Sequence, residues 1–229
     1  MELILVRHGY SEGNKDVKTH HLMPDHVIPL AEEGFAQAKE SADKVQEYLR
    51  NKYNKTEKTS AGCDDGSHHK VRLWTSPYLR TRQTAEPFAC ISWKDGCKIV
   101  GDHREDVALC EQQFGLFDGL SDEELQIKYP DEHLHYQKCE KFEGRFWARM
   151  PLGESRFDVA LRVHQVFGTW QRDLEKNGIQ TVIVVSHGVT IRAIVMRWLH
   201  LPFEWFEKEP NPKNCSIRII DCGKDLGYL

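Results

Sequence analysis

The sequence of 229 residues predicts an α/β protein: a single-domain three-layer α/β/α sandwich with a mostly parallel central sheet and a small helical cap insertion. Short strand-like runs alternate with helical patterns along the chain, which is typical of units that build a parallel sheet. The runs at residues 3–6 and 181–185 consist of β-branched and aliphatic residues throughout, as in strands buried on both faces. No repeat or linker separates two cores, so we expect one domain over residues 1–229.

The first half of the chain is expected to contribute three strands and two helices. The strands are residues 3–6, 71–74 and 99–100. Residues 32–50 predict a helix, because apolar side chains recur on one face of it at Phe35, Ala38, Ala42, Val45 and Leu49. Residues 51–70 are polar, contain glycine and lack periodicity, which predicts an exposed insertion loop. Ser76 followed by Pro77 predicts the start of the second helix.

In the second half, two capping patterns mark the starts of helices. Ser121 with Glu124 begins a short helix that must end near Pro130. Ser155 with Asp158 begins a longer one. Its apolar face is formed by Val159, Val163, Val166, Trp170 and Leu174. Further elements are strands at residues 181–185 and 217–220 and a helix at residues 189–199. That last helix is apolar nearly all round, so we expect it to be buried.

Composition excludes several classes of function. A formal net charge of -4 gives no basic field for a nucleic acid, and no apolar run is long enough to cross a bilayer. No basic-then-apolar signal precedes the first strand, and the seven cysteines form no CxxC pair. We therefore expect a cytoplasmic protein with reduced thiols that contacts neither nucleic acid nor membrane. The sequence does not predict its oligomeric state.

Polar side chains follow each predicted strand, at the sheet edge where ligands bind in open α/β folds. They are Arg7, His8, Ser11 and Asn14, then Ser76 and Arg80, then Glu111 after a loop, and finally Ser186, His187 and Gly188. Both His8 and His187 end an aliphatic strand and precede a glycine. This shared context predicts that the two rings lie in one pocket.

These residue types suit a phosphoryl group. Arginine forks and free N–H groups at helix starts after Gly9 and Gly188 would bind an oxyanion such as phosphate. Glu111 would be repelled by that anion unless it holds a proton, and protonating a leaving-group oxygen gives it a role. A neutral histidine can act as nucleophile while arginines neutralise the equatorial oxygens, so this chemistry requires no metal.

Six motifs, in order along the chain, resemble those of the histidine phosphatase superfamily, in its phosphoglycerate mutase-like branch. They are LVRHGYSEGN at 5–14, PLAEEG at 29–34, TSPYLRTRQTA at 75–85, LCEQQFGLFDG at 109–119, LGESRFDVALRV at 152–163 and VVSHGVTIR at 184–192. A lone RHG would be an accident of three residues, whereas six ordered motifs span nearly the whole chain. The chain departs from the usual pattern at Tyr10, Ala31 and Leu152, and none of these removes a reactive group.

The resemblance implies a role for each matching residue. His8 would be the phosphorylated nucleophile, and Glu111 the proton donor. The phosphoryl group would be bound by Arg7, Asn14, Arg80, His187 and the backbone of Gly188. Members of the family use no metal or organic cofactor. The other histidines, His20-His21, His68-His69 and the His133/His135 pair, are expected to be surface residues rather than metal ligands.

Three functions could share this site: a phosphatase, a phosphoglycerate mutase, with or without phosphatase activity, and a binding module that has lost its nucleophile. The complete set of His8, Arg80, Glu111 and His187 argues against the third. A mutase needs basic residues in the cap to hold a second anion. In the predicted cap, residues 112–150, basic and acidic side chains are interleaved and acidic ones prevail. The sequence therefore favours hydrolysis of a small phosphomonoester.

Overall fold

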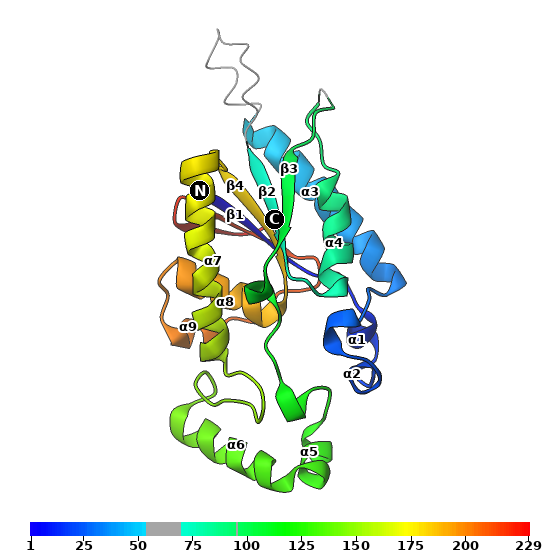
Figure 1. Ribbon diagram of the computed structural model, residues 1–229, viewed down its shortest axis with the longest axis vertical. Coiled ribbons are helices and arrows are strands. Elements are labelled where there is room, and N and C mark those ends of the chain that lie inside the picture. The colour runs from blue at the N-terminus through cyan, green and yellow to red at the C-terminus, as the bar shows by residue number, and fades with distance from the viewer. Residues whose placement is uncertain (54–69, 95) are drawn as a thin grey trace.

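A computed structural model describes residues 1–53, 70–94 and 96–229. Within these residues the chain forms a six-stranded sheet with strand order β3-β2-β4-β1-β5-β6 (Figure 1). The strands are β1 (Glu2–Arg7), β2 (Val71–Thr75), β3 (Val100–Glu105), β4 (Thr181–Ser186), β5 (Ile217–Asp221) and β6 (Lys224–Tyr228). Strands β1 to β4 run parallel, and β5 and β6 are antiparallel additions. This is the predicted α/β fold with a mostly parallel sheet.

Helices cover both faces of the sheet, because alternate side chains of its central strands point to opposite sides. Leu3 and Leu5 of β1 belong to a core with α7 (Arg156–Asn177), α8 (Gly188–Trp198) and α9 (Phe203–Lys208). Ile4 and Val6 belong to a second core with α3 (Glu32–Tyr53) and α4 (Leu79–Ala89). The three predicted layers are therefore helices, sheet and helices.

Shorter elements gather beyond the carboxyl ends of the parallel strands. The N-terminal ones are α1 (Glu12–Lys15), α2 (Thr19–Leu22) and the 3-10 turn η1 (Asp25–Val27). The 3-10 turns η3 (Val107–Leu109) and η4 (Gly115–Phe117) lead to α5 (Asp122–Lys128) and α6 (Pro130–Glu143). Figure 1 shows α5 and α6 at one end of the molecule, below the sheet. Both helices lie in the segment 112–150 that the sequence predicted as a cap.

Several predicted helix boundaries are confirmed by their caps. Ser121 and Ser155 both form capping boxes, in which the serine side chain accepts from the backbone at the third helical position. Helix α5 ends at Lys128, before Pro130 as predicted. Helix α8 is buried from Gly188 to Met196, as its all-round apolar sequence predicted.

Other predictions are wrong in detail. Helix α4 begins at Leu79 rather than at Ser76-Pro77, because Tyr78 has an extended backbone; the Ser76 hydroxyl accepts from the Tyr78 backbone at 3.3 Å and also lies against His187. The first helix after Gly9 begins only at Glu12. On α3, Phe35 was expected to face the core, but its side chain is 44% exposed.

The boundary of the predicted insertion loop is also shifted. Residues 51–53 continue α3, so the prediction of a loop over 51–70 is wrong for these three residues. The rest of that prediction falls on residues 54–69, which lie outside the described residues. Among the helices that are described, none has the length and hydropathy to cross a bilayer.

Candidate active site

The register of two central strands brings the two His-Gly motifs together. Strands β1 and β4 pair in parallel with Arg7 opposite Ser186, so the next residues, His8 and His187, are neighbours. The His8 backbone N–H extends the ladder by donating to the Ser186 carbonyl at 2.9 Å. The ring centroids of His8 and His187 lie 5.3 Å apart. The structure thus brings together the two histidines that the sequence placed in one pocket.

His8 is buried and its proton is assigned by one hydrogen bond. Its Nδ1 lies 2.8 Å from the Gly9 carbonyl oxygen, which can only accept, so Nδ1 carries the hydrogen and Nε2 keeps a lone pair. Burial lowers the pKa of His8 well below its usual range, and the positive charges of Arg80 and Arg7 lower it further. His8 is therefore neutral at neutral pH, the state that a nucleophile requires.

His187 is fully buried and contacts a residue that the sequence analysis assigned to a helix cap. Its Nε2 lies 2.9 Å from the Ser76 hydroxyl, and its Nδ1 lies 3.4 Å from an Arg80 nitrogen. Burial lowers the pKa of His187 well below its usual range, with Arg80 as the next cause. Ser76, which the sequence placed at this edge of the sheet as well as at the start of a helix, orients this ring.

The two arginines of the site come from different elements, Arg7 from β1 and Arg80 from α4. Arg7 ends β1 and donates to the Pro212 carbonyl at 2.7 Å. Arg80 lies on α4, is buried, and stacks over the Tyr78 ring, with its central carbon 5.0 Å from the ring centroid. Both nitrogens of its terminal fork also meet the Asp25 carboxylate. The sequence analysis did not single out Asp25.

Glu111 is held at the start of α8. Its carboxylate accepts from the Gln112 backbone at 3.0 Å, and it lies 3.5 Å from both the Val189 nitrogen and the Thr190 hydroxyl. Gly188 is the first residue of that helix, so Glu111 and the Gly188 backbone share one helix N-terminus. The arrangement sets a carboxyl group beside the histidine pair.

Arg162 of α7 fixes the loop that carries Glu111. Its guanidinium donates to the carbonyls of Ala108 and Glu111, at 2.6 and 3.0 Å, and to the Glu154 carboxylate. Glu154 in turn accepts from the Gln113 backbone at 3.0 Å. The segment from 108 to 113 is therefore tied to α7 at several points, which limits its freedom to move.

Asn14 and Asn214 form a pair of amides beside His8. The Asn14 Oδ1 completes the capping box of α1 and also accepts from Asn214 at 3.0 Å. The same Asn214 nitrogen lies 3.0 Å from the His8 carbonyl and 3.2 Å from that of Gly9. Because the Asn14 Oδ1 faces the Ser11 nitrogen and the Asn214 amide, the Asn14 amide nitrogen points away from these two groups. Asn214 lies in none of the six motifs, so its role could not be predicted from them.

Among the histidines outside this site, His21 and His135 are exposed as predicted, whereas His133 and His20 are not. His133 is buried, with its Nε2 2.8 Å from the Gln137 amide, whereas a surface position was expected. His20 lies between two carboxylates, those of Asp25 and Asp118. The pair His68-His69 lies outside the described residues. Within the described ranges, no three His, Cys, Asp or Glu side chains gather as a metal site would require.

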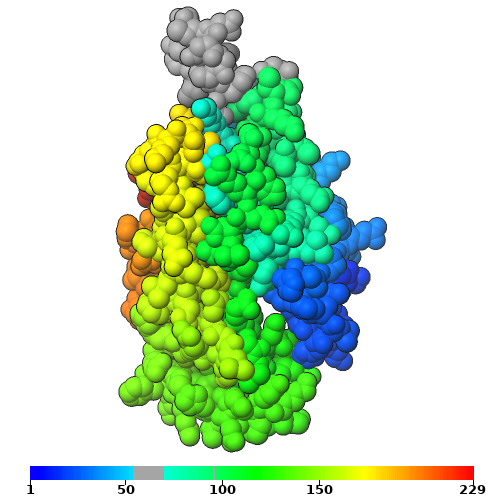
Figure 2. Space-filling view, viewed as in Figure 1, coloured from blue at the N-terminus to red at the C-terminus, as the bar shows by residue number. Residues whose placement is uncertain are grey.

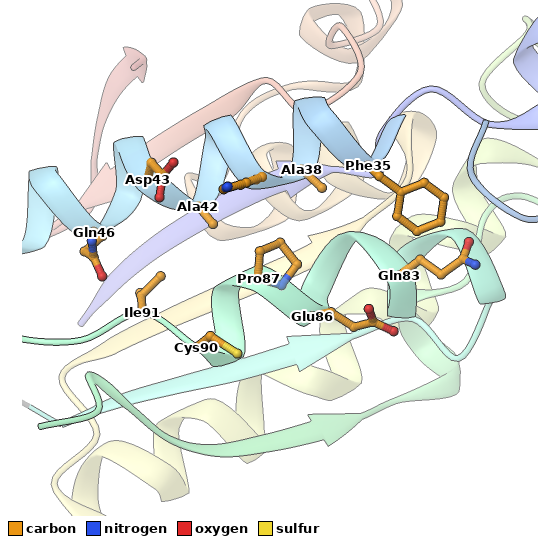
Figure 3. Close-up of a pocket in the computed structure, with 11 residues that line it drawn as sticks. Phe35, Ala38, Ala42, Asp43, Gln46, Gln83, Glu86, Pro87, Cys90 and Ile91 are labelled. Carbon is orange, nitrogen blue, oxygen red and sulfur yellow. The ribbon is translucent and has the colours of Figure 1, made fainter. Parts of the chain in front are cut away.

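A separate groove lies between α3 and α4 (Figure 3). It is lined by small apolar and uncharged polar side chains together with Lys39, Asp43 and Glu86, and by no histidine or arginine. Figure 3 labels ten of its residues: Phe35, Ala38, Ala42, Asp43, Gln46, Gln83, Glu86, Pro87, Cys90 and Ile91. This lining lacks the arginine forks that recognise a phosphoryl group, so the histidine pair stays the candidate site.

Comparison with known proteins identifies the family of the chain. The family model described as histidine phosphatase superfamily (branch 1) matches residues 64–229. The Arabidopsis thaliana "Phosphoglycerate mutase-like protein AT74H" is 34% identical over 99% of this chain and 75% of its own length. The Saccharomyces cerevisiae "Broad-range acid phosphatase DET1" is 24% identical over 98% of this chain and 86% of its own.

Solved structures share the fold. The mycobacterial glucosyl-3-phosphoglycerate phosphatase, solved with VO3, superposes with a TM-score of 0.66. It covers 96% of this chain and 92% of its own, at 22% sequence identity. At 22% sequence identity, this structural similarity shows a shared fold and does not show a shared function.

Proposed function

The chain belongs to the histidine phosphatase superfamily, branch 1, and from that membership and the geometry of its site we propose that it is a metal-independent phosphatase. It hydrolyses small phosphomonoesters through a phosphohistidine intermediate. The observation that supports this most is the neutral His8, with Nδ1 bound to the Gly9 carbonyl and Nε2 left as a base, beside two arginines. This is the form in which a histidine can attack phosphorus.

In the first half of the reaction, the His8 Nε2 lone pair attacks the phosphorus. The new N–P bond forms as the bond from phosphorus to the ester oxygen breaks. Arg7, Arg80 and the Gly188 N–H neutralise the oxygens on phosphorus while charge shifts among them. Glu111 gives its proton to the leaving oxygen, which departs as an alcohol.

In the second half, water attacks the phosphohistidine. The Glu111 carboxylate takes a proton from that water as the new P–O bond forms and the N–P bond breaks. Inorganic phosphate leaves, and both His8 and Glu111 return to their starting states. Glu111 thus acts once as an acid and once as a base, as a proton donor in a two-step displacement must.

The direct test uses an aryl phosphate, in the presence of a chelator, with the wild-type protein and His8→Ala. We expect phosphate release by the wild type and a loss of at least about 10³-fold in kcat for the variant, because no nucleophile remains. His164→Ala, at an exposed position on α7, serves as the matched control and should keep its activity. Activity that persists in His8→Ala, or that requires an added metal, would overturn the proposal.

A mutase activity, alone or beside hydrolysis, is the second candidate, because AT74H is described as phosphoglycerate mutase-like. A mutase must retain a substrate with two anionic groups. In the segment 112–150, Lys128, Lys138, Lys141, Arg145 and Arg149 alternate with a larger number of acidic residues. A coupled assay for 2-phosphoglycerate formed from 3-phosphoglycerate separates the two activities. Formation of that isomer faster than release of phosphate would favour the mutase.

A further inference from the structure

Asp25 engages the arginine that the phosphoryl group needs. Its Oδ1 and Oδ2 accept from the two terminal nitrogens of Arg80, at 2.8 and 3.1 Å. The Asp25 backbone carbonyl accepts from the same guanidinium at 2.7 Å. Paired nitrogens of an arginine that meet a carboxylate in this way are arranged as they would be for a phosphate. The Asp25 carboxylate therefore already contacts both terminal nitrogens of Arg80, and a bound phosphoryl group would share this guanidinium with it.

A second carboxylate stands near the first. His20 of α2 has its Nδ1 3.4 Å from the Asp25 carboxylate and 3.7 Å from that of Asp118. Burial raises the pKa of Asp118, and the negative charge of Asp25 acts in the same direction. The two carboxylates therefore oppose each other's charge, and they would oppose a further anion likewise.

Two glycines leave the space that the His20 side chain occupies between Asp25 and Asp118. An ideal Cβ at Gly13 would lie 2.6 Å from the His20 Nε2, and one at Gly119, whose φ is +71, would lie 2.9 Å from the His20 Cβ. A larger residue at either position would displace the His20 ring. The ring thus links the N-terminal segment to the segment that leads into α5, and it holds Asp25 and Asp118 close together.

Both carboxylates are more exposed than the residues that would bind the phosphoryl group, and Asp25 contacts one of those residues, Arg80. His8, Arg80 and His187 are buried, whereas the side chains of Asp25 and Asp118 are 21% and 34% exposed. A phosphoryl group bound by the buried residues must leave the rest of its substrate directed towards solvent. Figure 2 shows an opening at the surface between the blue N-terminal segment and the green segment that precedes α5. The leaving group would pass these carboxylates.

Among the described residues of the site, few positive charges are free to bind a second anionic group. The two positive charges of Arg7 and Arg80 face the negative charge of Asp25, and Glu111 is neutral while it holds the proton that it gives to the leaving oxygen. Both histidines are neutral, and Arg162 is paired with Glu154. A bound phosphate dianion would therefore make the site negative, and a carboxylate or second phosphate on the same substrate would add to an unfavourable charge.

We propose that Asp25 is a specificity-determining residue, which selects phosphomonoesters whose leaving group carries no negative charge. This rests on the proposed phosphatase function. Substrates that carry a carboxylate or a second phosphate close to the ester are disfavoured by the Asp25 and Asp118 charges at the mouth. Asp25 takes no part in bond formation, and it acts on the choice of substrate through charge.

Glycerol 3-phosphate and 3-phosphoglycerate test the selection by charge, because they share a three-carbon skeleton. Glycerol 3-phosphate carries a hydroxymethyl group where 3-phosphoglycerate carries a carboxylate. We expect wild-type kcat/KM to be higher for glycerol 3-phosphate. Asp25→Asn keeps the backbone contact to Arg80 and one side-chain oxygen as acceptor, and it removes the charge together with the second carboxylate oxygen. It should raise the ratio of kcat/KM for 3-phosphoglycerate over glycerol 3-phosphate by about tenfold, the effect of one charge at close range in a partly screened site. A ratio is unaffected by any loss of folded protein.

Asp118→Asn should shift the same ratio in the same direction, and Glu40→Gln, which removes an exposed carboxylate on α3, should leave it unchanged. Binding of both esters to His8→Ala and to His8→Ala with Asp25→Asn, measured by calorimetry, reports the same selectivity without turnover. Hydrolysis with an unchanged ratio in Asp25→Asn overturns the role of Asp25 and leaves the phosphatase standing. A shifted ratio of dissociation constants without any hydrolysis by the wild type upholds the role of Asp25 and overturns the phosphatase.

Discussion

The reactivity of His8 depends on two local features, burial and the Gly9 carbonyl. The carbonyl holds the hydrogen on Nδ1, and burial beside Arg80 keeps the ring neutral. His187 is also neutral but lies with its Nε2 against Ser76. The two rings therefore differ in what they present to a substrate, although their sequence contexts are nearly the same. This difference supports His8 rather than His187 as the nucleophile.

Glu111→Gln tests the proton-donor role. The amide keeps the shape of the side chain but cannot release a proton to the leaving oxygen. Alkyl phosphates, which leave as strongly basic alkoxides, should lose about 10²- to 10⁴-fold in kcat/KM, and 4-nitrophenyl phosphate much less. Steady-state rates with both esters decide this. Equal losses for the two esters would mean that Glu111 acts on binding rather than on proton transfer.

The buried histidines also predict how stability depends on pH. The folded protein holds the pKa of His8 well below the value of about 6.5 that the unfolded chain keeps. As pH falls below that value, the unfolded chain takes up a proton that the folded protein does not, so the free energy of unfolding decreases. Stability is therefore retained above the unfolded pKa and lost towards the folded one.

Denaturant unfolding of the wild type and of His8→Asn, at about pH 7 and about pH 5.5, measures this effect. Asparagine does not titrate, so the variant should lose less stability on acidification, by up to about 1.4 kcal/mol for each pH unit. His164→Asn, at the exposed position on α7, is the control and should behave as the wild type. An equal loss in His8→Asn and in the wild type would contradict a neutral, buried His8.

At the scale of elements, helix α7 supports the loop that carries Glu111. Replacing Arg162 by methionine keeps much of the side-chain volume but removes the bonds to the 108–113 segment and to Glu154. We expect a loss of about 2 kcal/mol in the free energy of unfolding, since charged hydrogen bonds are lost and Glu154 is left unpaired. We also expect kcat to fall more than KM rises, because Glu111 would be less well positioned.

Arg172→Met, on the same helix, is the matched control. Arg172 is exposed and donates to the Thr169 hydroxyl alone among the described contacts, so its replacement should change stability by less than about 0.5 kcal/mol. Unfolding curves and rates with 4-nitrophenyl phosphate compare the two variants. Similar kcat values for Arg162→Met and Arg172→Met would show that α7 does not position Glu111.

At the scale of elements, some strands could be predicted from the sequence and others could not. The strands β1 and β4 were predictable because a strand buried on both faces must be aliphatic throughout. Strand β6 was missed because Lys224–Tyr228, which begins with two charged residues and contains a glycine, lies at the sheet edge, where no apolar pattern is required. Strand β3 was placed too early, since only its first residue, Val100, is buried and apolar.

At the scale of the whole molecule, the parallel sheet gathers residues from distant parts of the sequence. The carboxyl ends of β1, β2 and β4 meet at one edge, so the sequence could predict that His8, Arg80 and His187 converge. The contacts of Asp25 with Arg80 and of Asn214 with His8 depend on how loops fold over that edge. Loops follow no periodic pattern, so these partners could be found only in the structure.

The central claim is that the phosphoryl group passes through His8, and a trapping experiment tests it most directly. The protein is mixed with a ³²P-labelled phosphomonoester, quenched in alkali within one turnover, digested and mapped by mass spectrometry. We expect the label on the peptide that contains His8, stable in alkali, lost in acid and absent from His8→Ala. Steady release of phosphate with no label at His8, or with the label on another residue, would contradict the account.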